Sequence, residues 1–436
     1  MDRGRGGRAG GPLSDAARQV GLRAATHYAA CGRRASERGD ETAAATLFRH
    51  AADLLPEGNP DRPGMLYEVA RAYGDTFEPR LAFAAADEAV HEAAAAGQTA
   101  LGWLARLERS FAHQLLDPHG KSTQEIRDEL AGAIASLEEA GDEAGLATAW
   151  RRRAEIEWMP CRFDSAAVAA ARAVEHARRV GKRSLLEHAL GIRSAAELFG
   201  SMRPDEMLAS VESAAEEVGH EGLFGHILMV QRSACAAMSG DLDRARRCSD
   251  EATALAERIG VPFYVAASCE FRGDFELFAG DAAAAERAYR RQYEILDRLG
   301  DEGHKSTAAA DLARALYRLD RLDEAETFAR LALEIAAQDD LVSQASGRCA
   351  RALVQAARGE HDDAIRSARE AVAIFEDAQS PVFQGTVWMT LAEVLRAAGR
   401  TDEAPGAARA ALGLFERKGN EPAITSTNAF LRTLEA

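Results

Sequence analysis

Residues 237–245, AMSGDLDRA, and residues 277–285, LFAGDAAAA, carry the same turn about forty positions apart in this chain. The turn recurs through the second half of the sequence as a residue pair, at Gly240-Asp241, Gly280-Asp281, Asp320-Arg321, Gly359-Glu360 and Gly399-Arg400. An alanine follows the first residue of each pair by five positions, at Ala245, Ala285, Ala325, Ala364 and Ala404. A second set of glycines keeps nearly the same spacing, at Gly141, Gly181, Gly219, Gly260, Gly300 and, after a gap, Gly419. A fixed period of this size indicates stacked supersecondary units and not one globular core.

The segments between these turns have the pattern of α-helices. Their apolar residues fall at helical spacing, and the alternation of β-branched residues that is typical of strands is nearly absent. Aspartates follow most turns and are suited to cap the next helix through its free amides; they are Asp40, Asp75, Asp241 and Asp281. The glycine before such a residue can supply the left-handed conformation that ends the preceding helix. Each unit is therefore predicted to be a helical hairpin.

Set in register, the units match the tetratricopeptide pattern of large and small residues. The first unit matches best, with Tyr28, Cys31, Gly32, Ala44, Phe48, Ala51 and Pro56. Later units keep a small residue where the two helices of a hairpin come closest, at Ala154, Ser233, Gly273, Ala313, Ala352 and Ala392. The sequence predicts an all-α fold, a right-handed superhelical solenoid of about ten tetratricopeptide-like hairpins with a period near 40 residues.

The small position at Gly273 provides a test of this register. Gly273→Leu is expected to destabilise the fold strongly through overpacking, whereas alanine should be tolerated because other units carry it. Two units are irregular, since the turn at 200–204 is longer by two residues and an insertion at 117–120 follows the helix of Trp103. A loop without a function is the simpler interpretation of both, and a binding loop is the alternative.

Three segments are expected along the chain. Residues 1–12, rich in arginine and glycine, are predicted to be a disordered tail, residues 13–420 the repeat array and residues 421–436 a C-terminal capping helix. Thr425, Ser426 and Thr427 give the last helix a polar side suited to cover the final apolar layer.

Composition argues against several kinds of partner. The formal net charge of −16 and the pI near 5.3 disfavour direct binding of nucleic acid. No apolar run approaches the roughly 18 residues that a membrane helix needs, so no membrane partner is expected. The six cysteines show neither CxxC spacing nor a metal-ligand cluster, which indicates small core residues in a reducing, cytoplasmic setting.

No motif for catalysis or for cofactor binding is complete in the sequence. Residues 120–122, Gly-Lys-Ser, look like the end of a phosphate-binding loop, but Leu115 stands where its first glycine must be. His220 and His226 lack the spacing of a metalloprotease helix. The arginine run 151–153 points in three directions round a helix, so most of it is interpreted as a solvated face. We therefore expect no enzyme activity, no cofactor and no metal, although a triad assembled from distant residues leaves no mark in a sequence.

The first unit carries a more specific resemblance. Between Ala16 and Glu88 the chain contains ACGRRA at 30–35, AADLLP at 51–56 and NPDR at 59–62. This stretch resembles the repeat arm of large actinobacterial signalling proteins, which carry a nucleotide-cyclase or DNA-binding domain and a STAND-type ATPase upstream. The resemblance implies an arm that senses or docks a partner. The chain begins where such an arm would begin, so we expect either a free-standing arm or one detached from a longer gene.

In tetratricopeptide arrays the first helix of each hairpin lines the inner face. Carried onto this chain, the candidate partner-binding residues are Arg151, Glu155, Trp158, Glu270, Asp274, Arg314, Tyr317, Glu393 and Arg396. Trp158 and Tyr317 would anchor a peptide there, and a concave face that is merely solvated is the alternative. The lysine–asparagine clamp of chaperone-binding repeats is absent, because charged residues occupy its asparagine positions, at Glu155, Asp274, Arg314 and Glu393.

Two functions remain open at this point. The first is a non-catalytic scaffold that binds a protein or peptide on its concave face. The second is the sensory or regulatory arm of a signalling regulator whose ATPase, cyclase or DNA-binding domains lie elsewhere or are lost.

Overall fold

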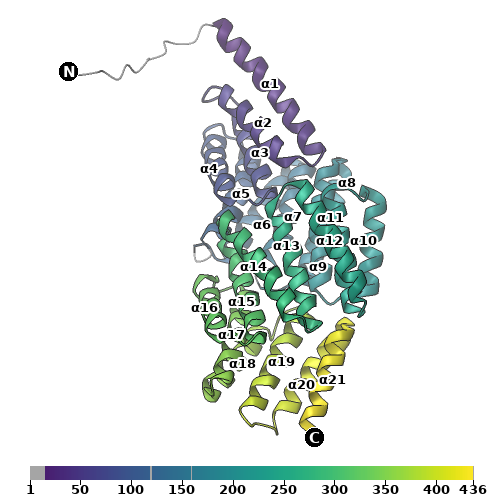
Figure 1. Ribbon diagram of the computed structural model, residues 1–436. Coiled ribbons are helices and arrows are strands. Elements are labelled where there is room, and N and C mark those ends of the chain that lie inside the picture. The colour runs from purple at the N-terminus through teal and green to yellow at the C-terminus, as the bar shows by residue number, and fades with distance from the viewer. Residues whose placement is uncertain (1–14, 118–119, 159, 436) are drawn as a thin grey trace, which may run out of the picture.

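The computed structural model describes residues 15–117, 120–158 and 160–435, and these residues form helices joined by turns, without a β-strand. The predicted disordered tail, residues 1–12, lies outside the described residues. Figure 1 shows α1 at one end of the molecule and α21 at the other. The helices are α1 (Asp15–Glu37), α2 (Glu41–Leu54), α3 (Arg62–Asp75), α4 (Pro79–Ala95), α5 (Thr99–Leu116), α6 (Thr123–Ala140), α7 (Glu143–Ile156), α8 (Phe163–Val180), α9 (Arg183–Phe199), α10 (Pro204–Val218), α11 (Gly222–Met238), α12 (Leu242–Ile259), α13 (Pro262–Phe278), α14 (Ala282–Leu299), α15 (Glu302–Arg318), α16 (Leu322–Ile335), α17 (Leu341–Ala357), α18 (His361–Ile374), α19 (Pro381–Ala397), α20 (Ala404–Lys418) and α21 (Glu421–Glu435).

Consecutive helices of the described chain pack as ten hairpins, from α1–α2 to α19–α20, and α21 packs on α20. The first helices of the last five hairpins begin at regular intervals of 39 or 40 residues, at Gly222, Pro262, Glu302, Leu341 and Pro381. The predicted all-α repeat solenoid is therefore confirmed. In two hairpins, α5–α6 and α9–α10, the two helices contact each other over a shorter length than in the other eight. These are the two units that the sequence marks as irregular.

Eight of the ten hairpins share one turn between their helices. A residue with positive φ ends the first helix, and the next residue donates its amide hydrogen to the carbonyl oxygen five positions back, as Asp241 does to Ala236 at 2.9 Å. The five turns that the sequence predicts, from 240 to 399, all have this form. Two further turns have it at Phe77 and Cys161, which the sequence did not indicate because neither residue type favours positive φ.

The hairpins form two layers. Most odd-numbered helices contact the next odd-numbered helix, whereas the even-numbered helices make their main contacts with their neighbours in sequence. Buried charged side chains concentrate on odd-numbered helices, among them Arg71, Asp75, Glu108, Arg152 and Asp311. The odd-numbered helices therefore form an inner layer and the even-numbered helices an outer one.

The superhelix closes on itself after about five hairpins. Helices ten apart in order touch each other, as α5 touches α15 and α11 touches α21. The hydroxyl of Tyr264 donates to the carbonyl oxygen of Asp75 at 3.4 Å, and the amide of Gln379 donates to the carbonyl oxygen of Cys161 at 2.9 Å. We call this boundary between successive superhelical turns the seam.

Two of the three non-glycine residues with positive φ in the shared hairpin turn, Phe77 and Cys161, lie at the seam. The third is Asp320, a residue type that tolerates this conformation. The Phe77 ring stacks on Phe263 with ring centroids 3.4 Å apart and planes 9° from parallel. Cys161 supplies the carbonyl oxygen that accepts from Gln379. A positive φ costs a non-glycine residue about 1–2 kcal/mol. Contacts across the seam thus stabilise a backbone conformation that Phe77 and Cys161 would otherwise avoid.

Glycines lie where the two helices of a hairpin come closest. A Cβ atom added to Gly32 would lie 2.8 Å from Cε1 of Phe48, and one added to Gly273 would overlap the ring of Tyr289. The predicted close approach at Gly273 is confirmed. The expected tolerance of alanine at this position is wrong, because in this unit an aromatic ring fills the space that a methyl group needs.

Most of the cysteines pack as the small core residues that the sequence predicts. No helix among the described residues has the length and apolar character to span a membrane. The six cysteines are all unpaired thiols, and four of them are buried. Burial raises the pKa of Cys269 and of Cys349 to about 11, so these thiols stay protonated and unreactive near neutral pH.

Candidate functional site

The nine candidate residues lie on the inner layer or directly beside it. They come from α7, α13, α15 and α19, and Trp158 follows the end of α7 by two residues. The structure divides them among four local clusters.

Arg151 and Glu155 belong to a network of ion pairs between α3, α5 and α7, which we call the arginine network (Arg71, Asp75, Glu108, Arg151, Arg152 and Glu155). Arg151 Nη2 donates to Asp75 Oδ1 at 2.9 Å, and Arg71 Nη1 donates to Asp75 Oδ2 at 2.7 Å. The side chain of Asp75 is 1% exposed. Burial opposes its charge, but Arg151, His188 and Arg71 hold the pKa of Asp75 well below its usual range.

The other half of the arginine network centres on Arg152. Its guanidinium donates to Glu108 Oε2 at 2.5 Å and to Glu155 Oε2 at 2.6 Å, and it lies 4.2 Å from the ring centroid of Phe111. Each of these charges has a partner inside the fold. The arginine network therefore holds three inner helices together and leaves few polar groups for a ligand.

Two interpretations made from the sequence are wrong at the arginine network. The run 151–153 is not mainly a solvated face, because the side chains of Arg151 and Arg152 are only 9% and 4% exposed. Asp75 does not cap a helix; it is the last residue of α3, and two arginines engage its carboxylate. In contrast, Asp40 and Asp281 do cap helices, accepting hydrogen bonds from the amides of Ala43 and Ala284.

Glu270 and Asp274 form, with Asp311, a second cluster that we call the acidic group (Glu270, Asp274 and Asp311). It lies where α13 faces α15, and this is where successive inner helices from α3 to α19 approach each other least. The hydroxyl of Tyr289 donates to Asp274 Oδ1 at 2.7 Å. Arg314 Nη1 donates to Asp311 Oδ1 at 3.2 Å and makes the one ion pair that the acidic group has among the described residues. Asp274 thus lies close enough to another candidate residue, Arg314, for their charges to interact across α13 and α15.

The negative charges of the acidic group are incompletely balanced. Burial and the neighbouring carboxylates raise the pKa of Glu270 to about 8, and burial followed by Asp274 raises the pKa of Asp311 to about 7. Gln292 Nε2 donates to Glu270 at 3.0 Å, while the Gln292 amide oxygen is buried without a hydrogen-bond partner in the described part of the chain. Acids with raised pKa values beside an unused acceptor favour a ligand that supplies positive charge and donors.

Tyr317, Glu393 and Arg396 lie in a third cluster, where α15 meets α19. Arg318 Nη2 donates to Glu393 Oε1 at 2.7 Å, and the same guanidinium lies 5.5 Å from the ring centroid of Tyr317. The guanidinium of Arg396 lies 4.7 Å from the ring centroid of Phe430 on α21. Tyr317 is half-buried and Arg396 is exposed. This cluster offers an aromatic side chain and both signs of charge to a partner.

Trp158 belongs to a fourth cluster, made of aromatic rings at the seam. Its ring packs edge-on against Phe163 and Phe199, with centroids 5.3 Å away in both cases. Phe199 in turn stacks on Phe383, which lies one superhelical turn away, at 5.6 Å. Trp158 therefore stabilises the seam, a role that the sequence did not predict.

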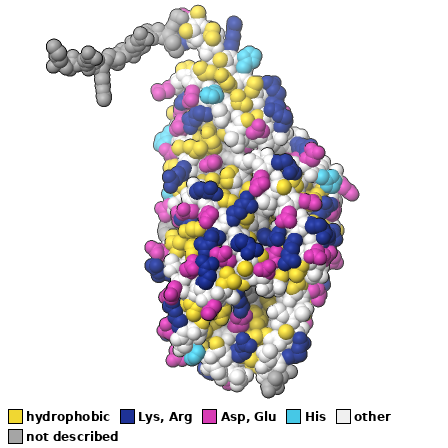
Figure 2. Space-filling model, viewed as in Figure 1, with side chains coloured by type: hydrophobic (Ala, Val, Ile, Leu, Met, Phe, Trp, Pro, Cys, Tyr) yellow, Lys and Arg dark blue, Asp and Glu magenta, His cyan; other side chains and the backbone are white. Residues whose placement is uncertain are grey.

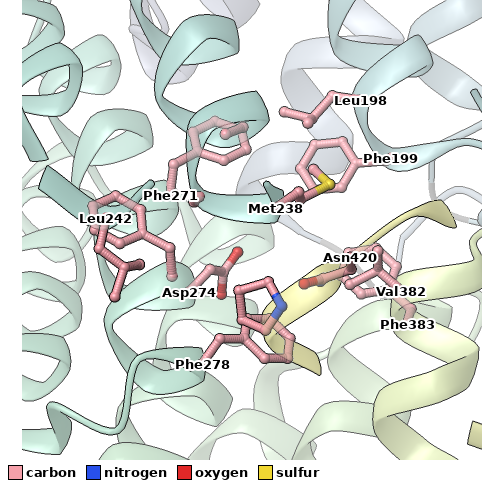
Figure 3. A pocket seen from close by; sticks show the side chains of 14 residues that line it. Leu198, Phe199, Met238, Leu242, Phe271, Asp274, Phe278, Val382, Phe383 and Asn420 are labelled. Atoms are coloured by element: carbon pink, nitrogen blue, oxygen red, sulfur yellow. The ribbon is translucent and has the colours of Figure 1, made fainter. Parts of the chain in front are cut away.

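A cavity of about 80 Å³ lies beside these rings, between helices from successive superhelical turns. We call it the phenylalanine cavity, because its lining is mainly apolar and includes Phe199, Phe271, Phe275, Phe278 and Phe383. Asp274 is the one charged side chain in the lining. Figure 3 shows the Asp274 carboxylate pointing into the space between the rings, with Asn420 on the opposite side. The acidic group and the phenylalanine cavity thus share Asp274.

The other motifs singled out in the sequence have local structural roles. Lys121 Nζ pairs with Glu129 at 2.5 Å, and Ser122 caps α6. His226 is buried, and its burial lowers its pKa to about 4. No group of side chains that could hold a metal ion occurs in the described ranges. Figure 2 shows acidic and basic side chains interspersed over the visible face.

Comparisons with known proteins identify the fold and no family. No protein-family model matches the sequence, and a search of curated proteins found no match. The fold is similar to that of the Rap protein complexed with competence and sporulation factor, with 13% identity and a TM-score of 0.62 over 84% of this chain and 100% of that chain. It is also similar to the APC/C hetero-tetramer Cut9–Hcn1, with 14% identity and a TM-score of 0.53 over 92% of this chain and 79% of that chain. Likeness at this level of identity supports a tetratricopeptide-like fold alone.

Several residues of these clusters were missed in the sequence. Asp311 and Arg318 stand three residues before and four after Arg314, so helical periodicity from that candidate position would have found both. Tyr289 and Phe199 carried no such signal, because each contacts its candidate residue from a different helix, Tyr289 from α14 and Phe199 from α9.

Proposed function

We propose that this chain is a non-catalytic scaffold that binds a protein or peptide partner along the inner layer between α13 and α19. The observation that carries the proposal is the contrast between two parts of that layer. In the arginine network the charged groups pair with one another, and all of them except Glu155 are buried. Between α13 and α19, Glu270, Asp274, Tyr317 and Glu393 keep accessible surface.

The chemistry of this stretch suits a polypeptide. A half-buried aromatic ring at Tyr317 can hold an apolar side chain, and the charged groups on either side can pair with main-chain or side-chain donors. Rap and Cut9 share the fold, and each was crystallised in a complex, which adds support at the level of fold. We expect the partner to contain few acidic residues, because the acidic group already carries excess negative charge.

Selection of peptides from a random displayed library against the full chain tests the proposal. Synthetic versions of the selected peptides are titrated calorimetrically against wild type and against the double variant Tyr317→Ala/Arg396→Ala. Loss of these side chains should weaken binding at least about tenfold, the usual scale for a hot spot. Arg330→Ala on α16 is the control, because Arg330 is exposed on the outer layer. Peptides that bind the double variant as tightly as wild type, or that lose affinity for the control, would contradict the proposal.

The regulator-arm alternative rests on the resemblance between Ala16 and Glu88. It predicts an in-frame ATPase gene segment directly upstream of the coding sequence. Reading that sequence separates the two proposals, because a scaffold that acts alone requires no such segment.

A further inference from the structure

The phenylalanine cavity has the size of a short aliphatic group. Its volume of about 80 Å³ is roughly half of the 150 Å³ that holds benzene in an apolar protein cavity. A branched side chain of three or four carbons fits such a space, whereas an aromatic ring does not. The lining of phenylalanine, leucine, valine and methionine side chains favours an apolar occupant, because binding it removes apolar surface from water.

The one charged lining residue adds a second requirement. Asp274 accepts from Tyr289 through Oδ1, and Oδ2 has no donor within the described residues. Asp274 lies beside Glu270 and Asp311, and Arg314 is the one cation paired within this acidic group. An occupant that carries an ammonium group would donate to the free oxygen and balance part of this negative charge.

The cavity, which requires an apolar group and an ammonium group on its occupant, lies next to the proposed partner-binding stretch. Its lining comes from α9, α11, α12 and α13 on one side of the seam and, on the other, from α19, Asn420 and α21. Asp274 faces the cavity and also belongs to the inner layer between α13 and α15. A peptide that lies on the inner layer can therefore place one of its ends in the cavity.

We propose that the phenylalanine cavity binds the N-terminal residue of the partner peptide, an aliphatic residue whose side chain packs among the phenylalanines and whose α-ammonium group pairs with Asp274. This inference rests on the proposed function and names the end of the partner that the site recognises. In leucine, isoleucine and valine the α-ammonium group is separated from the branched carbons by two or three bonds. A carboxylate at the edge of an apolar cavity matches that arrangement.

Calorimetric titration of the full chain with L-leucinamide tests the inference. Leucinamide carries the expected side chain and ammonium group, N-acetyl-leucinamide lacks the charge, and phenylalaninamide carries a ring too large for the cavity. We expect saturable binding of leucinamide, and binding at least tenfold weaker for each of the other two compounds. Equal binding of the acetylated compound, equal binding of phenylalaninamide, or no saturable binding of leucinamide would overturn the inference.

Two variants locate the bound probe. Asp274→Asn keeps an acceptor for Tyr289 but removes the charge, and Ala234→Leu fills the cavity with a side chain of its own while leaving Asp274 in place. Both should weaken leucinamide binding at least tenfold, whereas Asp243→Asn, an exposed carboxylate on α12, should leave it unchanged. Unaltered binding to both cavity variants would overturn the inference. If leucinamide fails while selected peptides still require Tyr317 and Arg396, the cavity inference falls and the proposed function stands.

Discussion

The ammonium group of Lys418 donates a hydrogen bond to the main-chain oxygen of Leu198 at 2.6 Å, across 220 residues of sequence. It also donates to the oxygen of Gly200 at 2.8 Å, and the whole residue is inaccessible to solvent. Leu198 and Gly200 lie at the end of α9, where carbonyl groups have no partner within the helix. A cation at the C-terminal end of a helix is stabilised by the helix dipole. Lys418 thus fastens the last hairpin to a helix one superhelical turn away.

Replacing Lys418 by methionine is expected to destabilise the chain by about 1–3 kcal/mol. Methionine has a similar shape, but it leaves the buried carbonyl oxygens at the end of α9 without a donor. Chemical denaturation measured by circular dichroism gives the free energy of unfolding. Lys182→Met is the matched control, because Lys182 is exposed and its loss should change the stability little. Equal stabilities of the two variants would show that Lys418 does not hold the seam.

Gly273→Ala should destabilise the chain by about 1–3 kcal/mol, because the new methyl group would overlap the ring of Tyr289. Gly413→Ala on α20 is the control. No atom lies within 4 Å of a Cβ at that position, so alanine should be neutral or stabilise the helix by up to about 1 kcal/mol. Thermal unfolding of both variants beside wild type measures the difference. A Gly273→Ala variant that melts with wild type would mean that Tyr289 moves aside freely.

Most of the repeat could be predicted from the sequence, and the seam could not. Turn pairs such as Gly240-Asp241 report local backbone geometry, which a short stretch of sequence determines. The closure of the superhelix depends on residues such as Lys418 and Cys161, whose partners lie about 220 residues away. Nothing in the periodicity of the helices distinguishes a lysine that will be buried at the seam from one that stays exposed.

Trp158→Ala should lower the free energy of unfolding by about 2–4 kcal/mol. Trp158 packs edge-on against Phe163 and Phe199, and truncating a large buried aromatic side chain costs about 3–5 kcal/mol; the partial exposure of Trp158 reduces that figure. A double-mutant cycle with Phe199→Ala measures the coupling by denaturant titration. A coupling near zero would show that Trp158 is free to serve as a partner anchor, as the sequence alone suggests.

The Glu270→Gln variant should be more stable than wild type, and the difference in free energy of unfolding should increase with pH. Burial first, and then the carboxylates of Asp274 and Asp311, raise the pKa of Glu270 to about 8 in the folded chain. A raised folded-state pKa means that the folded chain binds the proton more tightly than the unfolded chain, in which the pKa is about 4.5. The stabilising effect of that proton is therefore lost as the pH rises from about 4.5 to 8. The variant should be close to wild type near pH 5 and more stable by about 1–3 kcal/mol near pH 8.5, after allowance for solvent access to Glu270.

Denaturation at pH 5, 7 and 8.5 measures this pH dependence. Glu294→Gln is the control, because Glu294 is exposed on the outer helix α14 and should show no comparable trend. A Glu270→Gln variant whose advantage is the same at all three pH values would contradict the assignment of an unbalanced acidic group.

The sequence indicates which helices carry the candidate residues, but not which of these residues are available to a partner. Positions on the first helix of each hairpin do face inward, as Glu270 and Arg314 show. Whether such a residue is available to a partner depends on the side chain opposite it. Arg151 donates to Asp75, which stands 76 residues earlier in the sequence, and so it is not available to a partner. Glu270 instead lies beside other carboxylates. That difference requires the register between distant hairpins, which a single repeat does not contain.

Hydrogen–deuterium exchange of the full chain, with and without a peptide selected against it, tests the central claim most directly, because it reports which helices a partner covers. We expect slower exchange on binding in α13, α15 and α19, with α14, α16 and α18 of the outer layer little changed. Protection confined to the outer helices, with α13, α15 and α19 exchanging as in the free chain, would contradict it.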